Sequence, residues 1–178
     1  SVFPIEKLDW LNGVYIREMD PQRLARLLLP VFEQAGYEVN VERLIQVVPL
    51  LQPRIKTLHD AIPMGGFFFA EEFAPAPAEE LIQAKMDAAS TLRALEASRD
   101  ALATLPTFDA ATQEAALRPL AKELGLKAGQ LFGALRTATT AQQVAPPLFE
   151  TMEILGRDES LRRIDLAIEQ LRAVQPEA

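Results

Sequence analysis

The sequence contains no cysteine and only one histidine, and these two shortages exclude much of the chemistry that side chains can perform. Without cysteine, the chain can form neither disulfides nor thiolate metal sites. A single histidine, His59, cannot build a histidine-based catalytic triad or a multi-histidine metal site. In its polar helical segment we expect it to be a surface side chain. We therefore expect no catalytic residue and no metal ligand in this chain.

Long apolar runs and phosphate-binding glycine loops are also missing. No run reaches the roughly 18 apolar residues of a membrane-spanning helix, and the N-terminus lacks the order of a signal peptide. Gly65-Gly66 has neither the flanking strand nor the Lys and Ser/Thr of a phosphate-binding loop. With 49% hydrophobic and 24% charged residues, the 178-residue chain has the composition of a soluble globular protein of one or two domains. We expect a cytoplasmic monomer without a membrane association.

Basic residues are outnumbered by acidic ones, which gives a net charge of −7 and argues against non-specific nucleic-acid binding through bulk electrostatics. The acidity is concentrated in residues 71–116, which carry nine acidic and three basic side chains. Residues 117–136 carry four basic side chains and one acidic one. The charge distribution therefore leaves room for a local basic face outside the acidic segment.

Apolar residues recur at helical spacing along most of the chain, and no stretch alternates long enough to predict a strand. The helices predicted from this spacing cover residues 5–19, 21–35, 41–51, 54–62, 78–105, 110–124, 127–140, 148–155 and a last segment that starts at Asp158. Residues expected to cap helix N-termini are Asp20, Asn40, Thr107 or Asp109, and Asp158. Pro49 and Pro53 are expected to interrupt the pattern of the third helix. We predict an all-α fold.

A change of composition divides the helices into two groups. Residues 67–77 contain a run of phenylalanines followed by spaced prolines, and paired glycines precede them. This segment is the best candidate for a linker, although aromatic side chains of this size bury themselves against something. We therefore predict a first helical domain over residues 1–66 and a second over 78–178.

Two arginines and a Pro-Pro step stand out among the predicted helices. Arg54 follows Pro53 at a predicted helix start, and Arg136 lies one turn before the end of an apolar helix. The simpler interpretation of each is an exposed or salt-bridged arginine. The alternative is that its planar fork of donors reads the Watson–Crick edge of an unstacked base. Leu148, directly after the Pro-Pro step, is either a core residue, which is the default, or part of a stacking shelf.

Five segments of the chain, taken in order, closely resemble the C-terminal part of bacterial glutamyl-tRNA synthetases, which are class I aminoacyl-tRNA synthetases. They are KLDWLNGVYIREMD, LLQPRIKTL, LIQAKMD, LGLKAGQLFGALRTATT and APPLFETMEILGRDESLRRI. The resemblance covers residues 5 to about 171. It implies that residues 1–66 form the end of the stem-contact region and a first anticodon-binding domain, and that residues 78–178 form a second, both of the α-helix cage type.

The family's catalytic Rossmann-like domain, with its HIGH-type and KMSKS-type motifs, is absent from this sequence. The resemblance implies that ATP, and the magnesium expected with it, would be bound in that domain. This chain should hold no cofactor and should be inactive alone.

The resemblance also implies particular binding residues. Arg54 would recognise the third anticodon base, a cytosine, and so favour tRNA-Glu over tRNA-Gln. Arg136 and Leu148 would contact the other anticodon bases, while Pro146 and Pro147 would present main-chain groups to them.

The chain departs from the family pattern at one turn. Where the family commonly has Leu-Thr-Gly after the arginine helix, this chain has Thr139-Thr140-Ala141.

The function implied by the resemblance is recognition of the tRNA-Glu anticodon as part of a glutamate–tRNA ligase. Two alternatives are a helical protein-interaction module without RNA binding and part of a non-discriminating synthetase that also accepts tRNA-Gln. The acidic segment 71–116 and the phenylalanines at 67–69 motivate the first alternative. Arg54 weighs against the second.

Overall fold

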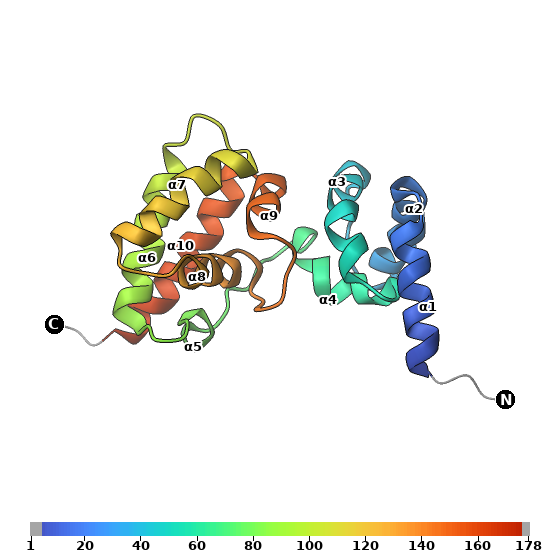
Figure 1. The fold of residues 1–178 in the computed structure, drawn as a ribbon, viewed down its shortest axis with the longest axis horizontal. Coiled ribbons are helices and arrows are strands. Elements are labelled where there is room, and N and C mark those ends of the chain that lie inside the picture. The colour runs from blue at the N-terminus through green and yellow to red at the C-terminus, as the bar shows by residue number, and fades with distance from the viewer. Residues whose placement is uncertain (1–4, 176–178) are drawn as a thin grey trace. The chain divides into compact units, whose positions relative to one another are not determined.

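In the computed structural model the described residues are 5–175, with side chains described from residue 12 onward. Their secondary structure is helical throughout, without a strand (Figure 1), so the prediction of an all-α fold is confirmed. The chain forms two compact units, unit 1 (Ser1–Glu72) and unit 2 (Phe73–Ala178). Their boundary falls inside the segment 67–77 that composition singles out as a linker. Within the described part of the chain, no helix is long and apolar enough to cross a membrane.

Unit 1 is built from helices joined by short 3₁₀ turns. Its elements are α1 (Ile5–Glu18), α2 (Pro21–Gln34), α3 (Val41–Leu51), η1 (Gln52–Arg54), η2 (Leu58–Asp60), α4 (Ala61–Gly65) and η3 (Gly66–Phe68). The predicted caps Asp20 and Asn40 each accept a hydrogen bond from the backbone N–H three residues later, at 3.1 Å. The core lies between α2 and α3 and includes Leu24, Leu28, Phe32, Leu44, Val48 and Leu51.

Pro49 does not interrupt the third helix, contrary to the prediction. It lies inside α3, which continues to Leu51. A proline here removes one backbone donor in the last turn. Burial of Leu51, which is fully inaccessible to solvent, keeps the chain helical beyond it.

The helix predicted over residues 54–62 is also absent as a single element. Ile55 has extended backbone angles (φ −112°, ψ 144°) and is buried, so it anchors the chain between two 3₁₀ turns. Helical structure restarts at a reciprocal capping box formed by Thr57 and Asp60. The capping box therefore divides the predicted helix in two.

The phenylalanines at the start of the predicted linker pack into unit 1. Phe67, Phe68 and Phe69 are all buried, and the ring of Phe69 meets that of Phe32 edge-on at 5.1 Å between centroids. Residues 67–69 are therefore part of the core of unit 1.

Unit 2 contains α5 (Ala78–Leu81), α6 (Ala88–Ala103), α7 (Ala110–Glu123), α8 (Ala128–Thr140), α9 (Leu148–Leu155) and α10 (Arg157–Val174). The most extensive contact between its helices is that of α6 with α10. One hydrophobic core joins all six helices and includes Leu81, Leu95, Leu102, Leu117, Leu131, Leu135, Met152, Ile164 and Leu171.

Two predicted boundaries in unit 2 are wrong. The helix predicted over residues 78–105 is broken, because Lys85 adopts a left-handed conformation (φ 63°) and Asp87 begins α6 with a capping box to Ser90. The last helix starts at Arg157 instead of being capped by Asp158. Asp158 lies in the first turn, where a carboxylate interacts favourably with the helix dipole. Asp109, one of the two alternatives for the next cap, is the observed N-cap of α7.

Candidate nucleic-acid interface

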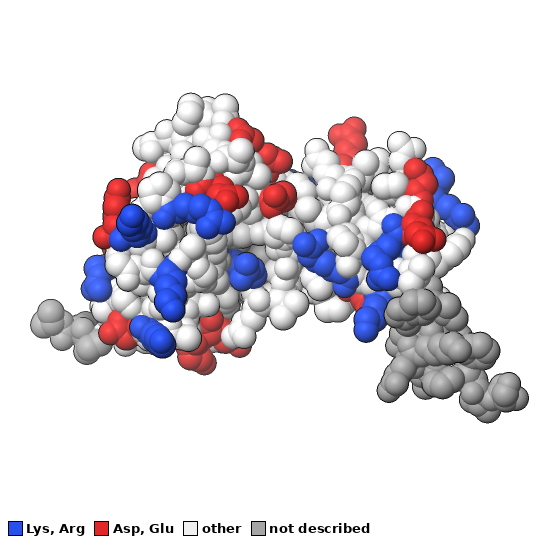
Figure 2. Space-filling view, in the orientation of Figure 1, with Lys and Arg blue, Asp and Glu red and all other residues white. Residues whose placement is uncertain are grey.

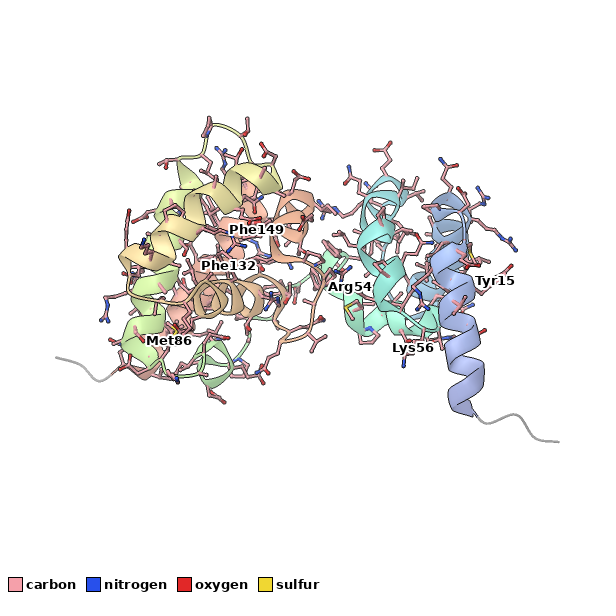
Figure 3. All side chains as sticks on the ribbon, in the orientation of Figure 1. Tyr15, Arg54, Lys56, Met86, Phe132 and Phe149 are labelled. Atoms are coloured by element: carbon pink, nitrogen blue, oxygen red, sulfur yellow. The ribbon has the colours of Figure 1, made fainter. Side chains whose placement is uncertain are left out.

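Arg54 ends the 3₁₀ turn η1 on the surface of unit 1 (Figure 3). Its Nη1 donates a hydrogen bond to the carbonyl oxygen of Leu50 at 2.9 Å. Its neighbours Leu51 and Ile55 are buried, so the backbone on both sides of the arginine is fixed by the core. The guanidinium is thus anchored by one N–H to its own backbone, and its remaining donors face solvent.

The turn that carries Arg54 is also attached to the end of α1. The side-chain amide of Gln52 donates to the carbonyl oxygens of Ile16 at 2.8 Å and Met19 at 2.7 Å. These carbonyls belong to the C-terminal end of α1, where a helix leaves acceptors without intrahelical partners. Gln52 therefore fixes the position of η1 relative to α1.

Arg136 lies in the last turn and a half of α8 in unit 2 and is half-buried. Its carbonyl oxygen accepts a hydrogen bond from the Thr140 hydroxyl at 2.7 Å, which stiffens the end of the helix. In the part of the chain that the structure describes, its guanidinium has no hydrogen bond or ion pair. Its donors are therefore available to a ligand.

The turn after this helix forms despite the unusual Thr139-Thr140-Ala141 sequence. Ala141 adopts the left-handed conformation (φ 58°, ψ 24°), and its N–H donates to the carbonyl of Thr137 at 2.9 Å. Glycine normally occupies such a position because a Cβ there costs about 1 kcal/mol. Ala141 nevertheless closes the helix in this conformation, the one that a glycine would favour.

Leu148 and the Pro-Pro step lie at the other end of the loop that follows Ala141. Leu148 is only 4% exposed and belongs to the hydrophobic core of unit 2, so the core interpretation of its side chain is correct. Pro146 is buried, and Pro147 is the N-cap residue of α9. A contact from Leu148 to a ligand can therefore come mainly from its backbone N–H, one of the donors that the first turn of a helix leaves free.

A buried arginine that we did not single out from the sequence supports this region. Arg163 is 2% exposed and donates from Nη1 to the carbonyl oxygen of Thr139 at 2.8 Å. Its Nε pairs with Glu159 at 2.8 Å, and its guanidinium lies over the ring of Phe73, 4.1 Å from the centroid. A positive charge at the C-terminal end of α8 is favourable for the helix dipole. Only the i, i+4 spacing of Glu159 and Arg163 hinted at this pair.

The carboxylate of Glu159 carries a strongly shifted pKa. Hydrogen bonds from Arg162 are the largest cause and, together with Arg163, they lower its pKa to about 2 against the opposing effect of burial. Glu159 is therefore ionised throughout the physiological range, and its charge balances the buried guanidinium.

The candidate residues divide between the units. Unit 1 carries Arg54, whereas unit 2 brings Arg136, Pro146, Pro147 and Leu148 to the two ends of one loop. Both arginines present unpaired N–H donors, which suits acceptor groups such as base edges and phosphates.

Comparison with known proteins places the chain in a family. The family of the anticodon binding domain matches residues 23–168. A glutamate–tRNA ligase of Dehalococcoides mccartyi is 46% identical over 176 residues, covering 96% of this chain and 36% of the relative. That of Roseiflexus castenholzii is 44% identical over 178 residues, covering 97% of this chain and 35% of the relative.

A solved structure gives the same result for the fold. The glutamate tRNA ligase of Elizabethkingia meningosepticum, crystallised in complex with its amino acid, superposes with a TM-score of 0.80 at 25% identity. The match covers 95% of this chain and 33% of that one. The chain therefore spans about a third of the length of the relatives that it matches.

Proposed function

Since the chain belongs to the anticodon-binding domain family, we propose that it binds the anticodon loop of tRNA-Glu as part of a glutamate–tRNA ligase. The observation that carries the proposal is the exposed guanidinium of Arg54, anchored by a single N–H and surrounded by a fixed backbone. A preorganised fork of this kind loses little conformational entropy when it binds.

The chemistry of the third anticodon base explains the proposed preference. Cytosine presents the acceptors O2 and N3 on its Watson–Crick edge, and both match the N–H donors of Arg54. Guanine presents N–H donors at the corresponding place, which oppose a guanidinium and leave its donors unpaired. Arg54 would therefore favour an anticodon that ends in C, as in tRNA-Glu, over one that ends in G, as in tRNA-Gln.

Unit 2 would contact the other anticodon bases through one side chain and several main-chain groups. Arg136 offers unpaired donors, and the first turn of α9 offers the N–H of Leu148. The carbonyl of Pro147 already accepts from Thr151 at 3.0 Å, so Pro146 is the proline whose carbonyl α9 does not use. Main-chain groups of this kind read single-stranded bases without moving a side chain.

By itself the chain would bind tRNA without attaching glutamate to it. In the ligases that it resembles, that reaction requires ATP and the catalytic domain, and neither of its signature motifs occurs in this sequence. The chain's own contribution would be to select the tRNA that the complete enzyme charges.

A direct test is titration of the 178-residue chain with fluorescent anticodon stem-loops whose anticodons are UUC and UUG. We expect tighter binding to the UUC hairpin. Equal affinity for the two hairpins would overturn the specificity and favour a non-discriminating enzyme.

Binding to neither hairpin would favour the alternative of a protein-interaction module. One of its two motivations has lost force, because the phenylalanines at 67–69 are buried in unit 1 and cannot dock a partner.

A further inference from the structure

Two further cations accompany Arg54 on unit 1, and we call the group Arg17, Arg54 and Lys56 the cation cluster. All three side chains are exposed. Figure 2 shows Lys and Arg side chains gathered on this part of unit 1, where Figure 3 labels Arg54 and Lys56. The cluster combines two elements, since Arg17 is in the last turn of α1 and the other two belong to the segment after α3.

Gly13 shows how closely the two elements approach each other. A Cβ atom built on Gly13 would lie 3.3 Å from Nη1 of Arg17 and 3.6 Å from both Cα and Cγ of Lys56. The guanidinium of Arg17 and the stem of Lys56 therefore lie against the same point of α1. The missing side chain at Gly13 is what lets them do so.

The backbone between Arg54 and Lys56 turns both side chains to the same side. Ile55 is extended and 1% exposed, so it points into the core of unit 1. In extended backbone, successive side chains point to opposite faces, with residues i and i+2 about 6.6 Å apart. Arg54 and Lys56 therefore both point outward, as neighbours along one line.

In the part of the chain that the structure describes, no carboxylate forms an ion pair with the cluster, although the charges of Asp60 and Lys56 attract each other. Asp60 is near, but its Oδ2 accepts hydrogen bonds from the backbone N–H groups of Lys56 at 2.9 Å and Thr57 at 3.0 Å. Burial alone would raise the pKa of Asp60, but these bonds, the Thr57 hydroxyl and the charge of Lys56 together outweigh it, and the pKa lies below its ordinary value. Glu18 follows Arg17, and adjacent helix residues do not face each other.

We propose that Arg17 and Lys56 bind backbone phosphates of the RNA beside the base that Arg54 reads. The inference rests on the proposed function and adds residues to its binding surface. Phosphate contacts fix the register of a nucleic acid on a protein, whereas base contacts supply specificity. Arg17 and Lys56 are exposed, lie against the same point of α1 and form no salt bridge with a described carboxylate, which suits the first task, and the anchored Arg54 suits the second.

The test is to measure affinity for the UUC and UUG hairpins over a range of salt concentrations. The variants are Arg17→Gln, Lys56→Gln and the double variant, because glutamine removes the charge and keeps much of the stem. Arg26→Gln is the matched control, because Arg26 is an exposed arginine on α2 that lines a pocket with Leu29 and Val41 and does not belong to the cation cluster. Each cluster variant should bind both hairpins less tightly by the same factor. The slope of log affinity against log salt should fall by about 0.7 for each lost contact.

The outcomes separate this inference from the proposed function. A salt slope for the cluster variants equal to that of Arg26→Gln would overturn it and leave anticodon recognition intact, provided that the parent chain still prefers UUC. A variant that changes the preference between hairpins instead of the slope would also overturn it. If the parent chain binds neither hairpin, both the proposed function and this inference fall.

Discussion

The two units present their candidate RNA-binding groups in opposite ways. In unit 1, Arg54 is exposed and anchored to a carbonyl of its own segment. In unit 2, Arg136 is half-buried, Leu148 is a core residue, and the buried Arg163 holds the helix end between them. Substitutions of the candidate RNA-binding group in unit 1 should therefore change RNA binding without changing stability, whereas substitutions in unit 2 should change both.

The largest effect should come from Arg163 in unit 2. Replacing it by methionine leaves the Thr139 carbonyl and part of Glu159 without a partner, and we expect a loss of about 3 kcal/mol in the free energy of unfolding. Urea denaturation followed by circular dichroism measures this loss. Arg162 pairs with the same carboxylate but its side chain is 52% exposed, so Arg162→Met should cost less than about 1 kcal/mol. Equal losses in the two variants would contradict the coupling.

The next effect concerns binding in unit 1. Arg54→Gln should reduce the preference for the UUC over the UUG hairpin by about 1–3 kcal/mol, by analogy with a lost bidentate base contact. The free energy of unfolding should change by less than about 0.5 kcal/mol, because the side chain is exposed. Arg54→Lys keeps the charge and loses the fork, so it should retain most of the affinity and lose the preference. A destabilised Arg54→Gln variant would show that the two properties are coupled in unit 1 as well.

The next effect concerns the sensitivity of unit 2 to acid. The pKa of Glu159 in the folded chain, about 2, lies below its ordinary value of 4.5, so the folded state binds fewer protons than the unfolded one. The stability it contributes is fully present above pH 4.5 and is lost as the pH falls towards 2. Asp109 in unit 2 has a pKa lowered from 3.8 to about 2 by hydrogen bonds from Thr107 and Thr112, so the stability that it contributes is lost as the pH falls below 3.8.

A titration of unfolding free energy against pH for the parent and Glu159→Gln checks this. The variant should start less stable at neutral pH and show a shallower decline below pH 4.5. Parallel curves would mean that Glu159 does not contribute to acid sensitivity.

The smallest effect should be a gain in stability at Ala141. Glycine removes the left-handed cost of about 1 kcal/mol and adds entropy to the unfolded chain. We therefore expect Ala141→Gly to stabilise unit 2 by about 0.5 kcal/mol, measured as a shift of the urea midpoint. The control, Ala138→Gly inside the same helix, should destabilise by about 1 kcal/mol or more. A destabilised Ala141→Gly variant would show that the loop needs the stiffness of alanine.

Local chemistry was predictable from the sequence, whereas the burial of polar groups was not. Asp20 and Asn40 cap helices as expected, and Asp109 is one of the two caps expected for α7, because a cap depends on a donor only a few residues away. The break before α6 was missed because strong helix propensity over residues 78–105 concealed the capping box at Asp87.

The candidate site likewise combines features that were predictable from the sequence with others that were not. Spacing alone favoured an exposed or salt-bridged role for Arg54 and Arg136, and the resemblance supplied the RNA-binding roles proposed for them. The position of Arg163 could not be predicted from spacing, since its main acceptor is the Thr139 carbonyl, 24 residues away in sequence. The cation cluster likewise depends on a close approach of α1 to Lys56 that no local pattern encodes.

The side-chain amide of Gln52 sets a condition for transplanting the Arg54 turn into another protein. Its acceptors, the carbonyls of Ile16 and Met19, lie more than 30 residues upstream, so a graft of residues 50–58 would leave the amide without them. A portable version of this recognition element must include the last turn of α1. That turn also carries Arg17, so the smallest movable module would bring its own cation with it.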